Sequence, residues 1–215
     1  MQVTLTFDNG PEPEVTPGVL DTLRRRDVAA TFFVLGRKLA SPDRRALAER
    51  AHDEGHWIGN HTYNHKVPFG ECGEVDPSEA EIGRTQSLLD ELTHPQRLFR
   101  PFGKGGQLGP HLLSPTTLAY LKAGRYTCVL WNAIPRDWEN PEGWVDVAMA
   151  QCRTQPWALM VVHDLPTGAM AGLDAFIGRV LDEGGRFRQE FPGDCLPLLE
   201  GREILPMTHL VTAAI

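Results

Sequence analysis

The sequence predicts an α/β fold, an incomplete (β/α) barrel of about seven strands, in a single domain that spans residues 1–215. Short apolar runs alternate with helix-like segments along the chain, which is typical of a mainly parallel sheet with helices outside it. Polar side chains stand at or just after the carboxyl ends of several runs, where a (β/α) barrel assembles its site from several strands. An open sheet would gather them mainly at one switch point, so the barrel is favoured.

The expected strands are short and rich in apolar residues. Residues 3–7 alternate in character, whereas residues 29–35 are nearly all apolar and should be buried on both faces. Residues 57–59 form a short strand that leads directly into a pair of histidines. Further strands are expected at residues 98–100, 126–131 and 158–162.

Helical segments separate these strands, with apolar side chains at helical spacing and glycines as plausible terminators. Gly55 ends one of them, and the pair Gly184-Gly185 follows the last. The predicted helices cover residues 17–26, 42–54, 77–92, 114–123, 144–152 and 173–182.

Charge and hydropathy exclude several classes of partner. The net charge is -7, and the one basic cluster, Arg24-Arg25-Arg26, falls in a helical pattern and is expected to form a solvated face, so no nucleic-acid partner is predicted. No apolar run approaches the roughly 18 residues that cross a bilayer, and no basic-then-apolar leader precedes the first strand. We therefore expect no membrane partner and a cytoplasmic location.

The four cysteines lie far apart and form no Cys-x-x-Cys pair, so neither a zinc ribbon nor a redox motif is readable. The sequence leaves it open whether the four cysteines form two disulfides. Cys128 falls in an apolar run, which favours a buried thiol at that position.

His61 and His65 are spaced four residues apart behind a short apolar run. On a helical turn this spacing presents both imidazoles on one side. Imidazole is neutral near pH 7 and binds borderline-soft cations such as zinc. The pair alone is common by chance, so a metal site depends on other ligands.

Four further motifs stand at strand ends, and each taken alone is an ordinary turn, surface or rim feature. They are Thr6-Phe7-Asp8-Asn9-Gly10-Pro11, Arg100-Pro101-Phe102-Gly103, Asp137-Trp138 and Met160-Val161-Val162-His163-Asp164. Together with His61 and His65, and in this order, they resemble the polysaccharide deacetylases of carbohydrate esterase family four, also called NodB-like domains. The resemblance runs from about residue 3 to about residue 185.

The resemblance implies a divalent-metal site in which Asp8 is the general base and Asn9, His61 and His65 are ligands. Zinc is the expected ion, with cobalt, nickel and manganese as alternatives. The family's first motif reads Thr-Phe-Asp-Asp-Gly-Pro, so Asn9 stands where the family has an acidic ligand. An amide oxygen coordinates without a full negative charge, and metal affinity should fall.

The remaining motifs resemble supporting parts. His163 would protonate the leaving group, and Asp164 would either tune the proton affinity of His163 or be only a loop carboxylate. Arg100 would hold Asp8 ionised and oriented, and Asp137 would in turn orient Arg100.

Three residues are expected around the substrate. The backbone N–H of Phe102 would help to stabilise an oxyanion. Trp138 and Val161 would form an apolar wall against the acetyl methyl group, since Val161 shares a strand face with His163.

Three functions stay open. The first is a metal-dependent hydrolase that removes acetyl groups from N- or O-acetylated sugars. The second is a metal-independent amidohydrolase on a small cyclic amide in the same fold, and the third is a non-catalytic carbohydrate-binding relative. The retention of Asp8, Arg100, Asp137 and His163 favours an enzyme.

Residues 67–77 and 104–109 are expected to form loops that rim the barrel mouth. They hold few aromatic rings on which a long glycan could stack, so a small acetylated compound or oligosaccharide is preferred over a cell-wall polymer.

Overall fold

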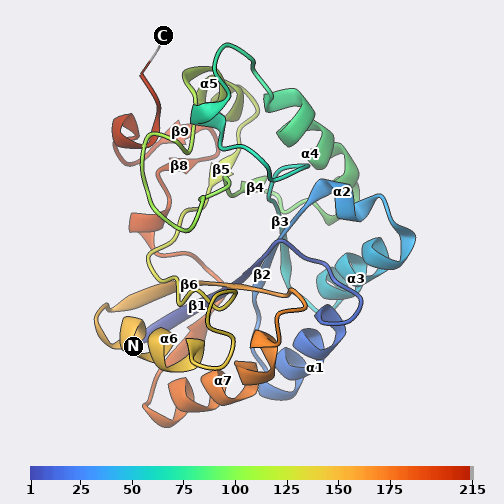
Figure 1. Ribbon diagram of the computed structural model, residues 1–215, viewed down its shortest axis with the longest axis vertical. Coiled ribbons are helices and arrows are strands. Elements are labelled where there is room, and N and C mark those ends of the chain that lie inside the picture. Colours follow the sequence, from blue (N-terminus) through green and yellow to red (C-terminus); the bar gives the residue numbers. More distant parts are fainter. Residues whose placement is uncertain (214–215) are drawn as a thin grey trace.

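The computed structural model describes residues 1–213, which form a curled sheet with helices on its outer side (Figure 1). The sheet order is β6-β1-β2-β3-β4-β5-β8-β9, and β7 pairs with β1. The strands are β1 (Gln2–Asp8), β2 (Thr31–Val34), β3 (Trp57–Asn60), β4 (Leu98–Phe99), β5 (Thr127–Cys128), β6 (Trp157–His163), β7 (Arg186–Arg188), β8 (Leu198–Leu199) and β9 (Arg202–Glu203).

The first seven strands are parallel to their neighbours, and β8 and β9 are antiparallel additions at one edge. Beyond β5 the chain turns toward β6, where Ala133 forms an isolated parallel bridge with Met160. This bridge closes the ring of strands, together with hydrogen bonds between the Asn132 side chain and the backbone of Trp157 and Leu159. The prediction of an incomplete barrel of about seven strands is confirmed.

The helices are α1 (Thr16–Arg26), α2 (Gly36–Leu39), α3 (Pro42–Asp53), α4 (Arg84–Leu89), α5 (Pro115–Ala123), α6 (Trp144–Arg153) and α7 (Leu173–Asp182). Local sequence explains several of their ends. Pro115 occupies the first turn of α5, and the Ser114 hydroxyl caps it by accepting a 3.0 Å hydrogen bond from the Thr117 N–H.

All six predicted helices are present, but the segment predicted at 77–92 is irregular. It begins with a π-helical turn, Glu79–Gly83, continues as α4, and ends in a 3-10 turn, Asp90–Leu92. The short helix α2 was not predicted, because its four residues carry no readable periodicity.

The core lies between the sheet and the helices that cover it. In both β1 and β6, every residue after the first is buried. Apolar side chains of α1, α6 and α7 pack against these strands, among them Leu20, Met149 and Phe176. Strands β1 and β6 are thus fixed along their length, which makes their carboxyl ends a rigid platform.

Two differences from the predicted strands have a physical cause. The strand expected at 126–131 is only Thr127–Cys128: the Val129 N–H still bonds to Phe99 of β4, but the Leu130 N–H bonds to Cys195 and the pairing with β4 ends. Strands β7, β8 and β9 were not predicted, because each is only two or three residues long and only tertiary pairing makes them strands.

Cys72, Cys128, Cys152 and Cys195 are all free thiols, and Cys128 is buried as expected. In the described part of the chain, no helix is long and apolar enough to cross a membrane. The single-domain organisation and the cytoplasmic location stay predictions.

Candidate active site

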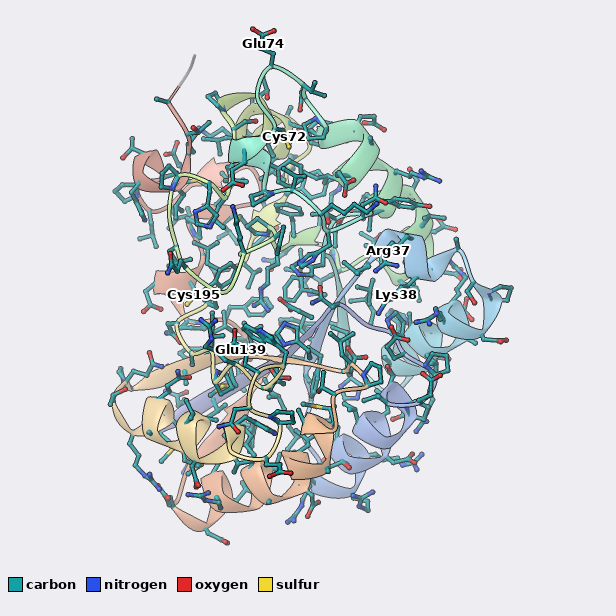
Figure 2. All side chains as sticks on the ribbon, in the orientation of Figure 1. Arg37, Lys38, Cys72, Glu74, Glu139 and Cys195 are labelled. Atoms are coloured by element: carbon teal, nitrogen blue, oxygen red, sulfur yellow. The ribbon has the colours of Figure 1, made fainter. Side chains whose placement is uncertain are left out.

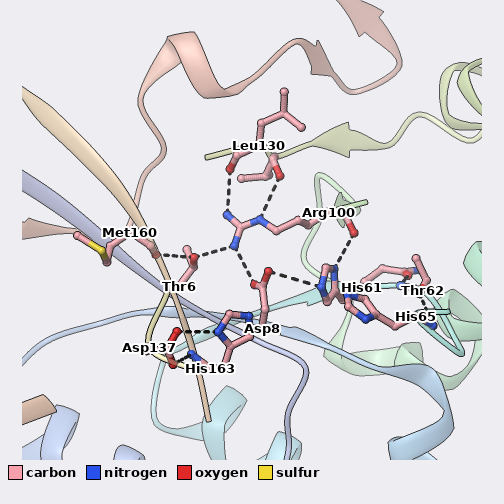
Figure 3. A network of polar contacts seen from close by, with 12 residues as sticks. Thr6, Asp8, His61, Thr62, His65, Arg100, Leu130, Asp137, Met160 and His163 are labelled. Carbon is pink, nitrogen blue, oxygen red and sulfur yellow. Dashed lines mark hydrogen bonds and ion pairs between the residues drawn. The ribbon is translucent and has the colours of Figure 1, made fainter. Parts of the chain in front are cut away.

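Asp8 and His163 lie side by side at the carboxyl ends of the adjacent strands β1 and β6. They are register partners in the parallel β1–β6 pairing, and both are nearly buried, Asp8 at 4% and His163 at 9% exposed. Each meets a different buried partner, as Figure 3 shows.

Arg100, which follows β4, holds Asp8. Its Nη1 donates to Asp8 Oδ1 at 2.8 Å and to Thr6 Oγ1 at 2.7 Å, while Nε and Nη2 donate to the carbonyl oxygens of Val129 and Leu130. The guanidinium is fully buried. The expected contact between Arg100 and Asp8 is therefore present, and this charge-assisted bond fixes the carboxylate.

The expectation that Asp137 orients Arg100 is wrong. Asp137 is fully buried and instead accepts two hydrogen bonds from His163, one from the backbone N–H at 3.0 Å and one from the ring Nδ1 at 2.8 Å. The bridge between Ala133 and Met160 places the loop that contains Asp137 beside β6 rather than beside β4.

The pKa of His163 is raised by this arrangement. Burial opposes protonation of the ring, but the hydrogen bond and the negative charge of Asp137 outweigh it. Because Asp137 engages Nδ1, the Nε2 of the imidazolium is left to face the cavity and to donate a proton.

His61 and His65 do come together, with ring centroids 4.5 Å apart, but not on a helical turn as expected. They lie in a loop after β3 in which Thr62 and His65 have φ of 67° and 55°. Asn60 shapes the loop, since its Oδ1 accepts from the Thr62 N–H at 3.0 Å.

Glu81, from the π-helical turn, anchors the same loop from outside. Its Oε2 accepts from the backbone N–H groups of Tyr63 and Asn64, at 3.0 and 2.7 Å, and its Oε1 accepts from Asn64 Nδ2 at 2.7 Å. One carboxylate thus fixes the residues between the two histidines.

Both imidazoles are neutral near pH 7. Burial lowers the pKa of His61, and burial together with the nearby imidazoles lowers the pKa of His65 to about 2. His61 Nδ1 lies 2.8 Å from the carbonyl oxygen of Arg100, which can only accept, so Nδ1 carries the proton. His61 Nε2, which lies 3.5 Å from Asp8 Oδ2, therefore holds a free lone pair.

Asn9 fits the third ligand position. Its backbone has φ of 74°, a left-handed conformation that asparagine and aspartate tolerate, and its Oδ1 is buried with no hydrogen-bond partner. Within residues 1–213, no three His, Cys, Asp or Glu side chains form a metal-binding group. A cation between the histidines would therefore depend on the Asn9 amide oxygen, and the unpartnered acceptor suits that role.

These residues line a cavity of about 310 Å³ at the barrel mouth. Eight of the ten predicted site residues face it, namely Asp8, Asn9, His61, His65, Phe102, Trp138, Val161 and His163. Arg100 and Asp137 lie behind the cavity wall, where each contacts one of the facing groups.

The rings that wall the cavity also pack on the histidines. Phe102 lies against His65 with centroids 4.0 Å apart, and Trp138 meets His163 edge-on at 4.9 Å. Sequence reasoning missed three further apolar wall residues, Trp131, Ile134 and Leu165. Trp131 ended a predicted strand just before a polar Asn132, which was a usable signal.

Asp164 is not part of the cavity. Its Oδ2 accepts from Thr16 Oγ1 at 2.5 Å, and its carboxyl packs so closely on Gly10 that a Cβ there would meet it at 2.2 Å. Burial, against the hydrogen bond from Thr16, raises its pKa to about 7. The charge of Asp164 is also one of the causes of the raised pKa of His163, which agrees with the expectation that Asp164 tunes the proton affinity of His163.

The barrel and its mouth define a class of (β/α)-barrel proteins in which a buried carboxylate and a buried imidazole lie beside two neutral histidines and an unpartnered amide oxygen. Comparison with known proteins gives the family. The sequence pattern of the polysaccharide deacetylase family matches residues 1–108, and this chain belongs to that family.

Two relatives illustrate the similarity. A peptidoglycan-N-acetylglucosamine deacetylase from Bacillus cereus is 30% identical over 193 residues, which cover 86% of this chain and 66% of the relative. A chitooligosaccharide deacetylase from Sinorhizobium fredii is 33% identical over 178 residues, covering 80% of this chain and 77% of the relative. The chain thus spans just under two thirds of the first relative's length.

Solved structures agree. A family 4 acetyl xylan esterase from Clostridium thermocellum, in complex with a cobalt ion, superposes with a TM-score of 0.68 at 26% identity, covering 87% of both chains. The family predicted from the sequence motifs is confirmed, and so is its NodB-like barrel.

Proposed function

We propose that this protein is a divalent-metal-dependent hydrolase that removes acetyl groups from N-acetylated sugars, with O-acetylated sugars as a related substrate. The observation that carries the proposal is the pairing of Asp8 with His163 on adjacent strands, facing one cavity that also holds Asn9, His61 and His65. Two relatives support the proposal by their names, one a peptidoglycan-N-acetylglucosamine deacetylase and the other a chitooligosaccharide deacetylase.

Asn9 Oδ1, His61 Nε2 and the His65 imidazole are the atoms that would hold the cation. When bound, a divalent cation would polarise the acetyl carbonyl and acidify the attacking water. Zinc is the expected ion, and the cobalt in the Clostridium structure supports a divalent metal in this fold.

Proton transfer is assigned to two groups with different partners. Asp8, oriented by Arg100, takes the proton of the attacking water, which requires a carboxylate within about 3 Å of that water. His163, whose pKa is raised by its hydrogen bond to Asp137 and by the negative charge of Asp137 against the opposing effect of burial, donates to the departing nitrogen or oxygen. The two residues thus divide the roles of base and acid.

The acyl group would lie against the apolar wall of Trp138 and Val161, and the backbone N–H of Phe102 would donate to the developing oxyanion. This wall accepts a methyl group and offers nothing to a charged acyl chain.

Acetate release from chitotriose tests the proposal. The metal-stripped protein should be inactive, and stoichiometric zinc or cobalt should restore release of acetate and of free amine in equal amounts. Full turnover in the metal-free protein, verified by elemental analysis, would contradict metal dependence.

That outcome would favour the metal-independent amidohydrolase, for which the uncharged Asn9 is the one supporting observation. Acetylated xylan and a small cyclic amide such as allantoin, assayed in parallel, separate the substrate classes. Tight binding of chitotriose without turnover of any substrate would instead indicate a carbohydrate-binding protein.

A further inference from the structure

A second cavity adjoins the first across the cation-binding residues. It encloses about 360 Å³ and shares Asn9, His65 and Leu165 with the wall of the cavity at the barrel mouth. A ligand that occupies both would therefore pass directly beside the proposed cation. No role has so far been assigned to this cavity, which we call the α2 cavity because α2 and the start of α3 form its outer side.

Positive charge dominates the α2 cavity. Arg37 and Lys38 of α2 and Arg44 of α3 line it, against a single carboxylate, Glu12. Figure 2 shows Arg37 and Lys38 together at α2. The cavity thus carries two more positive charges than negative ones.

Glu12 is already committed to two of the three cations. Its carboxylate accepts from Lys38 Nζ and from Arg44 Nη1, and Arg44 also donates to the carbonyl oxygen of Pro11 at 2.7 Å. Lys38 is only 7% exposed, and burial lowers its pKa despite the opposing effect of Glu12. Lys38 and Arg44 therefore form a fixed part of the cavity lining, and Glu12 neutralises part of their positive charge.

Arg37 is different. Its backbone N–H donates to the carbonyl oxygen of Tyr63 at 3.2 Å, which ties its main chain to the histidine loop. Its side chain is exposed, and within residues 1–213 it has no ion-pair partner at 4.0 Å or less. A guanidinium on a fixed backbone at the rim of a cavity is suited to bind a planar or tetrahedral oxyanion.

We infer that the α2 cavity binds an oxyanion, a carboxylate or a phosphate, carried by the sugar next to the one whose acetyl group is removed. This inference rests on the proposed function and adds a preference for anionic saccharides. The concave setting strengthens the preference, because charges on a low-dielectric wall are screened less than charges on a flat surface.

The test compares three N-acetylated trisaccharides of equal length: chitotriose, chitotriose oxidised to a single C6 carboxylate, and chitotriose with a single 6-phosphate. We expect kcat/KM for an anionic trisaccharide to exceed that for chitotriose by about tenfold, the size of one charge-assisted hydrogen bond. The gain should lie mainly in KM and should shrink at high salt. The better of the two anionic substrates identifies the source of the oxyanion.

Arg37→Gln should bring the anionic-to-neutral ratio close to one. Arg24→Gln is the matched control, because Arg24 is an exposed arginine of α1 paired with Asp21, outside both cavities; it should keep the wild-type ratio. Equal kcat/KM for all three trisaccharides in the wild-type protein, or an unchanged ratio in Arg37→Gln, would overturn the inference.

Calorimetric binding of the same three trisaccharides separates this inference from the proposed function. If no acetate is released from any of them, the proposed function fails. Tighter binding of the anionic trisaccharides that is lost in Arg37→Gln would still support oxyanion binding in the α2 cavity. Equal binding of all three would reject the inference independently of turnover.

Discussion

Asp8 and His163 face one another as register partners on β1 and β6, and each is held by its own buried partner. Arg100 donates to Asp8 at 2.8 Å, and Asp137 accepts from His163 at 2.8 Å. The guanidinium of Arg100 thus supports the proposed base, and the carboxylate of Asp137 supports the proposed acid. Because the two supporting pairs are separate, changes in one should be distinguishable from changes in the other.

The first prediction concerns the base. Asp8→Asn should lower deacetylation of chitotriose by at least about 100-fold, because an amide cannot take a proton from water. The substituted side chain can still accept from Arg100, and Thr6, Val129 and Leu130 also hold that guanidinium. Cooperative thermal unfolding should therefore persist at a lower melting temperature. Asp146→Asn, an exposed acid paired with Arg179, is the control; substantial activity in Asp8→Asn would refute the assignment.

The second prediction concerns the acid. If protonated His163 is required, activity falls as the pH rises through its pKa, which lies above the ordinary value of 6.5. In Asp137→Asn the raising effect of the carboxylate is lost while burial remains, so the descending limb of kcat/KM should move to lower pH. The measurement is a pH profile with saturating zinc, and a limb that stays in place would assign it to another group.

The third prediction concerns the amide in the cation site. Asn9→Asp should raise zinc affinity by more than about tenfold, since a full negative charge replaces an amide oxygen beside a divalent ion. Aspartate tolerates the left-handed backbone at this position, so the change is electrostatic rather than conformational. Calorimetric zinc titration is the readout, with Asn140→Asp, which lies outside both cavities, as the matched control. Equal zinc affinity in wild type and Asn9→Asp would remove Asn9 from the ligand set.

Most of the cavity could be predicted because parallel strands align their carboxyl ends. Asp8 and His163 follow or end apolar runs, and once the runs are strands of one sheet these residues must converge. The same reasoning gives Arg100 after β4 and His61 after β3. Strand periodicity and motif order are local signals, and they sufficed for these positions.

Contacts made between distant loops could not be predicted in this way. Asp137 was paired with the wrong partner because its position depends on how the chain after β5 crosses to β6, and only the Ala133–Met160 bridge decides that. Glu81 was read only as part of a helix, although it bonds the histidine loop some 17 residues earlier. Neither relationship leaves a period or a motif in the sequence.

Glu81 gives the fourth prediction. Glu81→Ala removes the acceptor for two backbone N–H groups between the histidines, and zinc affinity should fall about 10- to 100-fold, as for other supporting partners of metal ligands. Glu79→Ala is the matched control, because Glu79 lies in the same π-helical turn but accepts from Tyr120 Oη at 2.7 Å. Equal losses in both variants would indicate a general disturbance of the turn rather than a specific hold on the loop.

The last prediction concerns Asp164 and the pH dependence of folding. Burial raises its pKa from 3.8 to about 7, against the lowering effects of Thr16 and Lys38. Between these pH values the folded state holds a proton that the unfolded state has released, so stability falls as the pH rises through this window. Asp164→Asn removes this titration. Its free energy of unfolding relative to wild type should therefore increase from about pH 4 to about pH 7, on the order of 4 kcal/mol in total, and then level off.

Urea unfolding at several pH values measures this difference, and titrations common to both proteins cancel in it. Thr16→Val supplies the second arm, because it removes the hydrogen bond that lowers the pKa of Asp164. In that background the loss of stability should continue to higher pH than in the wild-type protein. A difference between wild type and Asp164→Asn that stays constant from pH 4 to pH 8 would mean that Asp164 ionises alike in both states. The carboxyl behind Gly10 would then be a solvated loop group rather than a buried one.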